Sequence, residues 1–376
     1  MLHVADPRRL KRSSAATTLD ISDITAQAAR LEAFDRHERI WLGRDDERGL
    51  TAIVAVHNTT LGPALGGTRI WPHESFEAAL TDALRLSRGM TLKSAIACMP
   101  FGGGKAVIIA DPQRDKTPEL LDAYAEMLAA LDGQFYTGED VGLTLADADY
   151  LRKRTTNVAG TTLGGSGNPS PVTAEGVFRG LRAAWKHATG STDLEDVRVA
   201  VQGLGSVGRA LADRLADAGA KLTVADIDEK RVARAVDELG ATPAGPDEIV
   251  AADVDVFAPC ALGGVLSPQT IPALKAKVVA GSANNQLLHH EDARLLMERG
   301  ILYAPDYVIN AGGLINVAAE LAPDGYDRAA VEARLDAIPT TLEDIFTAAE
   351  LQGRPTNDVA QAIAEQRIAE AEVSAR

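Results

Sequence analysis

The hydrophobic pattern in the first half of the chain predicts strands mixed with helices. Residues 51–58 (TAIVAVHN) and 106–112 (AVIIADP) are apolar, β-branched runs typical of buried strands. Ser75 is a good N-cap for a helix that begins at 76, because apolar residues recur at helical spacing over 76–90. The glycine-broken stretch 63–70 predicts a turn between strand and helix.

A different pattern begins after residues 160–172, which are dense in Gly, Pro, Ser and Thr and predict an interdomain loop. Hydrophobic strands then alternate with helices as far as about Ala330, where a charged, helical region begins. The segments that contain these strands are 197–208, 221–228, 254–261, 277–284 and 301–308. Such alternation predicts a parallel sheet covered by helices on both faces. The fold class is therefore α/β, with an N-terminal α/β domain and a doubly wound, Rossmann-type second domain.

A dinucleotide-binding motif follows the first strand of this second half. It has the form G-x-G-x-x-G, and the residues that we expect to hold a cofactor are Gly203, Gly205, Ser206, Val207 and Gly208. The first glycine permits a tight turn, the second lets a pyrophosphate approach, and the third lets helix and strand pack closely. The phosphate would then lie at the positive end of a helix.

The strand after this motif ends at Asp226, about 20 residues from the first glycine, where such folds carry a ribose-binding carboxylate. A carboxylate accepts hydrogen bonds from both ribose hydroxyls and repels a 2′-phosphate. We therefore expect NAD rather than NADP. The alternative to cofactor binding is that the glycine motif forms a purely structural Rossmann turn that holds no ligand.

Lys105 lies in the glycine-rich stretch MPFGGGKAV. A P-loop is excluded, because Met99 replaces the leading glycine and Ala106 replaces the hydroxyl that would bind magnesium. Lys93 lies upstream, and the segment LKSAIACMPFGGGKAVIIA contains no charged residue besides these two lysines. A lysine in such surroundings must pair with an anion or lose its proton easily.

Asp140, in YTGEDVG, and the glycine pair Gly66–Gly67 complete a possible catalytic group. One lysine can hold a substrate carboxylate, while the other, activated by desolvation and a cationic neighbour, can act as a general base. Asp140 can then relay protons. Beside a nicotinamide ring, this chemistry indicates dehydrogenation of a small α-amino or α-hydroxy acid.

These residues belong to blocks that resemble the glutamate/leucine/phenylalanine/valine dehydrogenase family. The resemblance runs from about Glu38 to the C-terminal helices, and the first 25 or so residues fall outside it. The blocks are long, ordered and specific to the family: TTLGPALGGTR, GMTLK, GGGKAVI, TGEDVG, GNPSPVTA, FAPCALGG, GSANNQL and YAPDYVINAGGLINV.

The resemblance implies a role for each site residue. Lys93 would bind the substrate α-carboxylate, Lys105 would activate water to attack the imino carbon, and Asp140 would shuttle protons at the amino nitrogen. Asn284 would contact substrate and nicotinamide, and Thr173 would lie by the nicotinamide amide. The implied reaction converts an L-amino acid, water and NAD to a 2-oxo acid, ammonium and NADH.

The resemblance also implies how the chain is divided. We expect a flexible tail over 1–25, a substrate and oligomerisation domain over 26–165, and a Rossmann NAD-binding domain over 166–339. The C-terminal helices, 340–376, would pack back on the substrate domain. Family members are typically homo-oligomers built through the N-terminal domain, and the same is expected of this chain.

Four residues bear on the choice of amino acid. Family glutamate enzymes carry a lysine at the position of Leu65 and a serine at that of Val317. A pocket lined by Leu65, Leu314 and Val317 would leave a second carboxylate desolvated and unpaired, which costs several kcal/mol. Leucine and valine enzymes have Ala at the position of Gly138 and Val at that of Leu314, whereas the Gly–Leu pair is similar to that of several phenylalanine enzymes. We expect an aromatic substrate, with a branched-chain substrate as the alternative.

Composition narrows the partners and the compartment. The 376 residues are 46% hydrophobic and carry a net charge of −15, so no electrostatic footprint for nucleic acid or an anionic membrane exists. Cys98 and Cys260 form no metal-ligand or disulfide framework, which fits a reducing cytoplasm and no metal. No apolar run approaches the roughly 18 residues of a membrane span. The basic N-terminus lacks the apolar region of a secretory signal.

Two other classes of protein remain as alternatives. An NAD-dependent hydroxy-acid dehydrogenase would use a His–carboxylate pair, and neither His57 nor His73 has a candidate partner in a matching motif. An NAD-sensing binding protein would keep the glycine motif without needing Lys93, Lys105 and Asp140 together.

Overall fold

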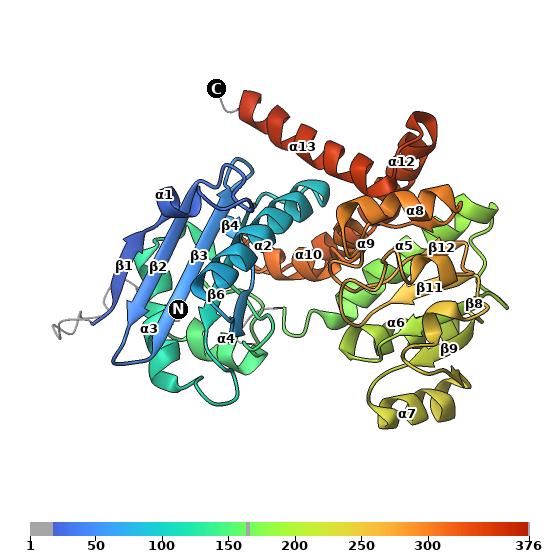
Figure 1. Ribbon diagram of the computed structural model, residues 1–376, viewed down its shortest axis with the longest axis horizontal. Helices are drawn as coiled ribbons and strands as arrows, with labels where there is room; N and C mark the ends of the chain where they lie inside the picture. The colour runs from blue at the N-terminus through green and yellow to red at the C-terminus, as the bar shows by residue number, and fades with distance from the viewer. Residues whose placement is uncertain (1–17, 163–165, 375–376) are drawn as a thin grey trace, which may run out of the picture.

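The protein consists of two α/β domains that lie side by side, as the computed structural model of Figure 1 shows. The structure describes residues 18–162 and 166–374. Most of the tail expected over 1–25 therefore lies outside the described residues. Residues 20–23, however, form strand β1, paired with the next strand of the sheet. Because this edge strand is held by backbone hydrogen bonds and buries little, its sequence carries almost no hydrophobic signal.

The N-terminal domain is built on a mixed sheet. Its strands are β1 Asp20–Asp23, β2 Arg39–Asp45, β3 Leu50–Asn58, β4 Ala64–Leu65, β5 Thr68–Trp71, β6 Gly102–Ile109 and β7 Phe135–Tyr136. Its helices are α1 Thr25–Ala28, α2 Phe76–Ile96, α3 Pro118–Ala130 and α4 Leu145–Arg152. The sheet order is β1-β2-β3-β6-β4-β7, and β5 also pairs with β6. The cap predicted at Ser75 is confirmed, since its side chain accepts a hydrogen bond from Ala78 N.

Strand β3 has apolar residues at successive positions rather than at alternate ones. Its residues alternate between two cores: Val54 packs with residues of α3, and Ile53 and Ala55 pack with residues of α2. Because helices cover both faces, neither face of the strand needs polar side chains.

The glycine-rich stretches are strands, which corrects the turn predicted over 63–70. Strands β4 and β5 are separated only by Gly66–Gly67, and the glycines at 102–104 begin β6. A Cβ at Gly103 would lie 2.1 Å from the backbone nitrogen of Thr91 in α2. These glycines therefore serve close packing of backbone against backbone rather than chain reversal.

The second domain is a parallel, doubly wound sheet. Its strands, in the order β10-β9-β8-β11-β12-β13, are β8 Arg198–Gln202, β9 Lys221–Ala225, β10 Thr242–Pro243, β11 Val256–Pro259, β12 Val278–Val279 and β13 Leu302–Tyr303. Its helices are α5 Ser170–Thr189, α6 Ser206–Asp217, α7 Glu229–Leu239, α8 Ala293–Glu298, α9 Asp306–Ile309, α10 Gly312–Ala319 and α11 Arg328–Leu335. The strand order reverses between β8 and β11, the point where such sheets bind dinucleotides. The predicted fold class is confirmed.

The two C-terminal helices pack on different domains. Helix α12 (Ala337–Gln352) packs on α5 of the second domain, whereas α13 (Thr356–Ser374) crosses back to α2 of the first (Figure 1). Arg367 of α13 donates hydrogen bonds to the carbonyls of Ala95 and Ile96 at the end of α2. Within 340–376, α13 is thus the element that reaches the N-terminal domain.

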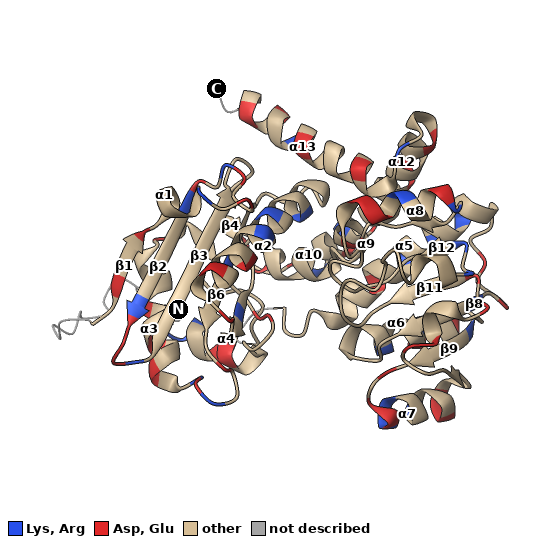
Figure 2. Cartoon of the chain, viewed as in Figure 1, with Lys and Arg blue, Asp and Glu red and all other residues tan. Residues whose placement is uncertain are grey.

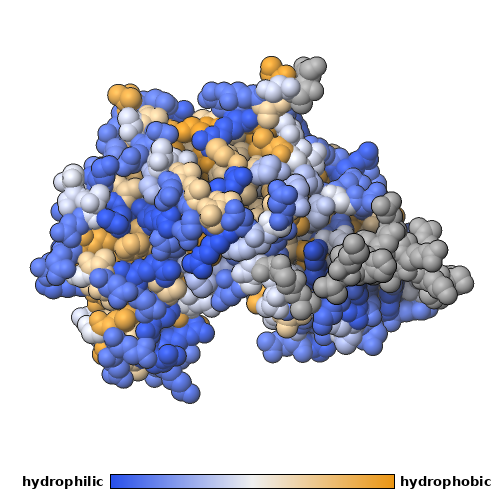
Figure 3. Space-filling model, turned by 180° about the vertical axis from the view of Figure 1, so that it is seen from behind, coloured by the Kyte–Doolittle hydropathy of each residue, from blue (hydrophilic) through white to orange (hydrophobic). Residues whose placement is uncertain are grey.

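Helices such as α7 and α13 carry many charged residues, while β3 and β11 carry none (Figure 2). Seen from behind, hydrophilic residues cover most of the surface, with hydrophobic residues in smaller patches between them (Figure 3). Within the described residues, no helix is long and apolar enough to cross a bilayer.

Two glycine substitutions test the packing account of the N-terminal domain. Gly103→Ala should destabilise the protein by about 1–3 kcal/mol or more, because its methyl group would collide with Thr91 backbone. Gly89→Ala, on the exposed side of α2 with open space around it, should stabilise by about 0.5–1 kcal/mol. Urea unfolding of both variants measures the difference. Equal effects would contradict the account.

Candidate active site between the domains

A cavity of about 300 Å³ lies between the two domains and brings most of the predicted site residues together. The predicted residues that line it are Leu65, Gly66, Gly67, Lys93, Lys105, Gly138, Asp140, Thr173, Val207, Asn284, Leu314 and Val317. They come from both halves of the chain, and they are up to about 250 positions apart. The cavity is therefore a product of the tertiary fold, not of any local motif.

Lys105 and Asp140 form the ionic centre of this cavity. Lys105 projects from β6 and is only 7% exposed, and its ammonium group is in direct contact with Oδ2 of Asp140. Asp140 lies in the loop after β7, where its backbone exchanges two hydrogen bonds with Leu143 and fixes the turn. The contact is direct, so a proton can pass between the two groups without an intervening water.

Gly66 and Gly67 let the backbone approach this pair. A Cβ at Gly67 would lie 2.6 Å from the carbonyl oxygen of Glu139, and one at Gly66 would lie 1.9 Å from that of Gly104. A side chain at Gly67 would push this stretch away from the Asp140 loop, and one at Gly66 would push it away from β6. The two glycines therefore allow the backbone to pack closely here and leave space beside Lys105.

The charge on Asp140 is set by opposing effects. Burial alone would raise the pKa of the Asp140 carboxyl, but the positive charges of Lys105 and Arg69 lower it below its usual value. Asp140 is thus ionised near neutral pH. The neighbouring Glu139 has a raised pKa, because it is desolvated and lies beside the Asp140 charge.

Lys93 joins the two domains. It lies in α2 of the N-terminal domain, and its Nζ donates a 2.7 Å hydrogen bond to Oδ1 of Asn310, which follows α9 in the second domain. Asn310 in turn donates to Oδ1 of Asn284, at 2.8 Å. Burial lowers the pKa of Lys93 to about 8; Lys105 contributes to the lowering, and Asp306 opposes it. Lys93 is a cation that a ligand carboxylate would stabilise.

Sequence reasoning missed Asn310 and Asp306, which surround Lys93 from the second domain. Asp306 is half-buried, and desolvation raises the pKa of its carboxyl despite hydrogen bonds from the backbone nitrogens of Tyr307 and Gln286. Both residues lie in the block YAPDYVINAGG, whose polar residues among apolar neighbours were an available signal.

The remaining wall of the cavity is apolar. Leu65, Leu314 and Val317 face it together with Met90, a further residue that sequence reasoning missed. A Cβ at Gly138 would lie 3.0 Å from the carbonyl oxygen of Ala159, so the backbone there is already close. This wall would desolvate a charged side chain without pairing it, and it favours an apolar one.

The glycine motif has the features that a dinucleotide needs. A Cβ at Gly205 would meet nothing within 4 Å, which leaves room for a pyrophosphate, whereas one at Gly208 would lie 2.0 Å from the carbonyl oxygen of Gly203. Gly203 also has φ +96°, a left-handed conformation that suits glycine. Helix α6 begins here without a side-chain cap, so its first N–H groups are available to an anion.

The structure separates this motif from the cavity proper. The cavity is not lined by Gly203, Gly205, Ser206, Gly208 or Asp226. Val207 is the residue of the motif that lines it, together with Thr173 and Asn284 from neighbouring segments. A dinucleotide bound at the motif would therefore reach the cavity with one end only. The residues present fit such a cofactor.

A Rossmann sheet with a glycine motif, joined to a domain that holds a Lys–Asp pair in the interdomain cavity, defines a nicotinamide-dependent dehydrogenase of two domains. Two family models match the chain: "Glu/Leu/Phe/Val dehydrogenase, dimerisation domain" over 38–157, and "Glutamate/Leucine/Phenylalanine/Valine dehydrogenase" over 164–230 and 224–375. The chain belongs to the Glu/Leu/Phe/Val dehydrogenase family. It is an amino acid dehydrogenase, an oxidoreductase that acts on CH–NH2 groups.

Characterised relatives differ in the amino acid that they are named for. The chain is 50% identical to leucine dehydrogenase of Geobacillus stearothermophilus (90% of this chain, 92% of the relative) and 45% identical to phenylalanine dehydrogenase of Bacillus thermotolerans (90% of each). The crystal structure of L-tryptophan dehydrogenase from Nostoc punctiforme superposes with a TM-score of 0.78 at 46% identity, covering 90% of this chain and 97% of that one. Each of these relatives is named for a hydrophobic amino acid.

The lowered pKa of Lys93 predicts a pH-dependent stability difference. Folding lowers the pKa from 10.5 to about 8, so the unfolded chain binds more protons between these values and wild type gains stability as pH rises through them. The stability of Lys93→Met relative to wild type should therefore fall by up to about 3 kcal/mol between pH 8 and 10.5. Urea unfolding at intervals of half a pH unit measures this, with exposed Lys275→Met as the control. A flat difference for both variants would refute the assignment.

Proposed function

We propose that the protein catalyses the reversible, NAD-dependent oxidative deamination of a hydrophobic L-amino acid, with an aromatic side chain preferred. The observation that carries this proposal is the trio of Lys93, Lys105 and Asp140 in one cavity, opposite a dinucleotide motif. An NAD-sensing protein would have no use for such a trio.

The roles of the residues follow from their positions. Lys93, which is half-buried, would bind the α-carboxylate, and its hydrogen bond to Asn310 would hold it between the domains. NAD bound at the glycine motif would supply a hydride acceptor for the α-carbon. Lys105 would then act as the base that activates water at the imino carbon, and Asp140 would move protons to and from the amino nitrogen.

The preference for an aromatic side chain rests on Gly138 and Leu314. Compared with an Ala–Val pair, the missing methyl at 138 deepens one wall while Leu314 thickens another, so the pocket is reshaped. Leucine is the second candidate, because leucine dehydrogenases are among the relatives with 47–50% identity. One methylene in such a pocket is worth only about 1–3 kcal/mol, so both substrates would be accepted to some degree.

Asp226 supports NAD rather than NADP. Its two carboxylate oxygens accept hydrogen bonds from the backbone nitrogens of Leu204 (2.6 Å) and Asp228 (2.9 Å), which hold it at the end of β9. A carboxylate fixed there would bind ribose hydroxyls and repel a 2′-phosphate. Arg231 lies 3.7 Å from Asp226 and is the residue through which some NADP use would arise.

We also propose a cytoplasmic homo-oligomer assembled through the N-terminal domain. The description of the family model over 38–157 as a dimerisation domain supports this. The two cysteines, both free in the structure, fit a reducing compartment.

The activity is tested by mixing the protein with NAD or NADP and a panel of L-amino acids, and following NADH or NADPH absorbance. We expect NADH formation, highest kcat/KM for phenylalanine or tryptophan, lower values for leucine and valine, and little with glutamate. Highest kcat/KM for leucine would support the second candidate. No NADH with any amino acid, with 2-hydroxy acids reacting instead, would overturn the proposal.

Lys105→Ala in the same assay tests the base. Turnover should fall about 10²–10⁴-fold, or about 3–5 kcal/mol of barrier, because the group that activates water is lost. The melting temperature and NAD affinity serve as controls for folding and cofactor binding. Near-normal turnover would place the base elsewhere.

Gly138→Ala combined with Leu314→Val tests the specificity assignment. The ratio of kcat/KM for leucine to that for phenylalanine should rise roughly tenfold or more, since the pocket walls then match those of leucine enzymes. The new methyl at 138 needs a small shift of Ala159 backbone, so the melting temperature is measured alongside. An unchanged ratio in a folded variant would rule out this pair as the determinant.

A further inference from the structure

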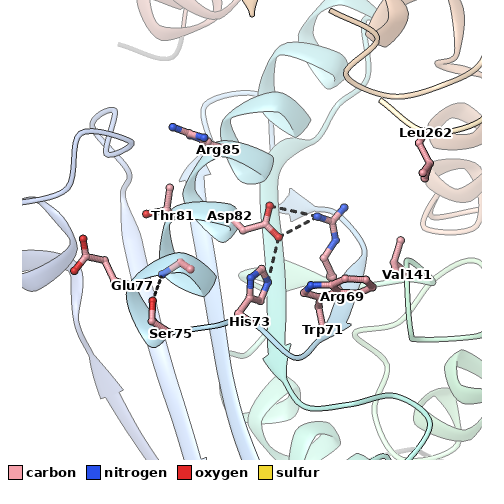
Figure 4. A pocket seen from close by; sticks show the side chains of 11 residues that line it. Arg69, Trp71, His73, Ser75, Glu77, Thr81, Asp82, Arg85, Val141 and Leu262 are labelled. Carbon is pink, nitrogen blue, oxygen red and sulfur yellow. Dashed lines mark hydrogen bonds and ion pairs between the residues drawn. The ribbon is translucent and has the colours of Figure 1, made fainter. Parts of the chain in front are cut away.

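A second, larger cavity of about 830 Å³ has Arg69 in its wall, together with Val141, the residue that follows Asp140 (Figure 4). Arg69 belongs to β5 and follows Gly66–Gly67 closely. Its Nη1 donates hydrogen bonds to both carboxylate oxygens of Asp82 in α2, at 2.9 and 3.3 Å. The mechanism above gives this arginine no part.

The other edge of the same guanidinium faces the active site. Nε of Arg69 lies 3.7 Å from Oδ2 of Asp140, the oxygen that contacts Lys105. Nε is buried and makes no hydrogen bond within the described residues. The guanidinium therefore lies between two carboxylates, with its free N–H edge directed toward the catalytic one.

Asp82 is itself held in place from outside. Nε2 of His73 lies 3.4 Å from Oδ2 of Asp82, and Figure 4 shows His73, Asp82 and Arg69 in contact. The ionisable groups thus form a continuous row from His73 to Lys105. Because Asp140 lies between Lys105 and Arg69, its carboxylate has little freedom to turn away from Lys105.

We propose that Arg69 is a positioning residue of the active site, which holds the Asp140 carboxylate on Lys105 from behind while Asp82 anchors the guanidinium. The inference rests on the proposed function of Asp140 as the proton shuttle. A guanidinium suits this task because it stays charged at all relevant pH values and can contact two carboxylates with different edges.

The charges that surround Asp140 determine how the loss of Arg69 would change the pKa of the Asp140 carboxyl. Lys105 contacts it from β6, Arg69 from β5, and Lys93 acts on it from α2, while the adjacent Glu139 opposes them. Loss of Arg69 removes one of the positive charges that lower the pKa of Asp140. That pKa should then rise, and the proton shuttle should fail at a higher pH than in wild type.

Three variants test the proposal. Arg69→Met removes the positive charge and the N–H donors of the guanidinium. Arg69→Lys keeps a positive charge that cannot contact both carboxylates. Arg85→Met is the matched control, since Arg85 is exposed on α2 and lines the same cavity (Figure 4). For each, kcat and kcat/KM are measured from pH 5 to 10, together with the melting temperature and NAD affinity.

We expect Arg69→Met to lower kcat about 10–100-fold with unchanged NAD affinity, and to move the acid limb of the pH profile up by about one unit. Arg69→Lys should show less than a tenfold loss, and Arg85→Met less than twofold. A purely structural role would lower the melting temperature of both Arg69 variants without moving the acid limb. That result would overturn the proposal.

A second measurement does not depend on activity. In protein labelled with ¹³C at aspartate carboxyls, the resonance that disappears in Asp140→Asn is titrated in wild type and in Arg69→Met. Its midpoint should rise by about one pH unit in the variant, and an unchanged midpoint would refute the proposal. If wild type oxidises no amino acid, the proposed function fails while this titration still decides the role of Arg69.

Discussion

The structure depends on placing two ammonium groups and one carboxylate in a cavity that is largely withdrawn from water. Charges that are withdrawn from water are costly unless they have a partner, and each of these three groups has one. Asp140 contacts Lys105, and Lys93 is bound by Asn310. A substrate that brings a carboxylate and an amino group would therefore enter a site whose charges are already arranged for it, and little reorganisation would be needed during the reaction.

This requirement explains the glycines around the site. Gly66, Gly67 and Gly103 let strands and helix approach at distances that no Cβ would permit, and the backbone then excludes water from Lys105. Glycine in a strand weakens it, because it packs no side chain and loses more entropy on folding. The N-terminal sheet compensates with helices on both faces, so the local weakness lies within a well-packed domain.

The sequence was most informative where a motif imposes a spacing. The turn from Gly203 to Gly208 and the two lysines in apolar surroundings each have a local physical signature, and the structure places the turn at the start of α6 and both lysines in one cavity. Their roles stay predictions. The sequence was less informative where the tertiary fold decides. Strand β4 has no hydrophobic period to read, β1 is held by its backbone, and Asn310 meets Lys93 only because the two domains pack together. The polar residues of the block YAPDYVINAGG are visible in the sequence, but their contact with a lysine more than 200 positions away is not.

The segment that connects the domains also packs against the apolar wall of the cavity. Gly138 packs against the carbonyl of Ala159, and a Cβ at Gly160 would lie 3.3 Å from the side chain of Val317 in α10. The backbone nitrogen of Gly160 donates a 2.9 Å hydrogen bond to Glu320, just after the same helix. Any change in the angle between the domains would therefore move the apolar wall relative to Gly138. Under the proposed function, substrate preference would depend on how the domains are joined as well as on the side chains that face the ligand, because one short segment of chain carries both.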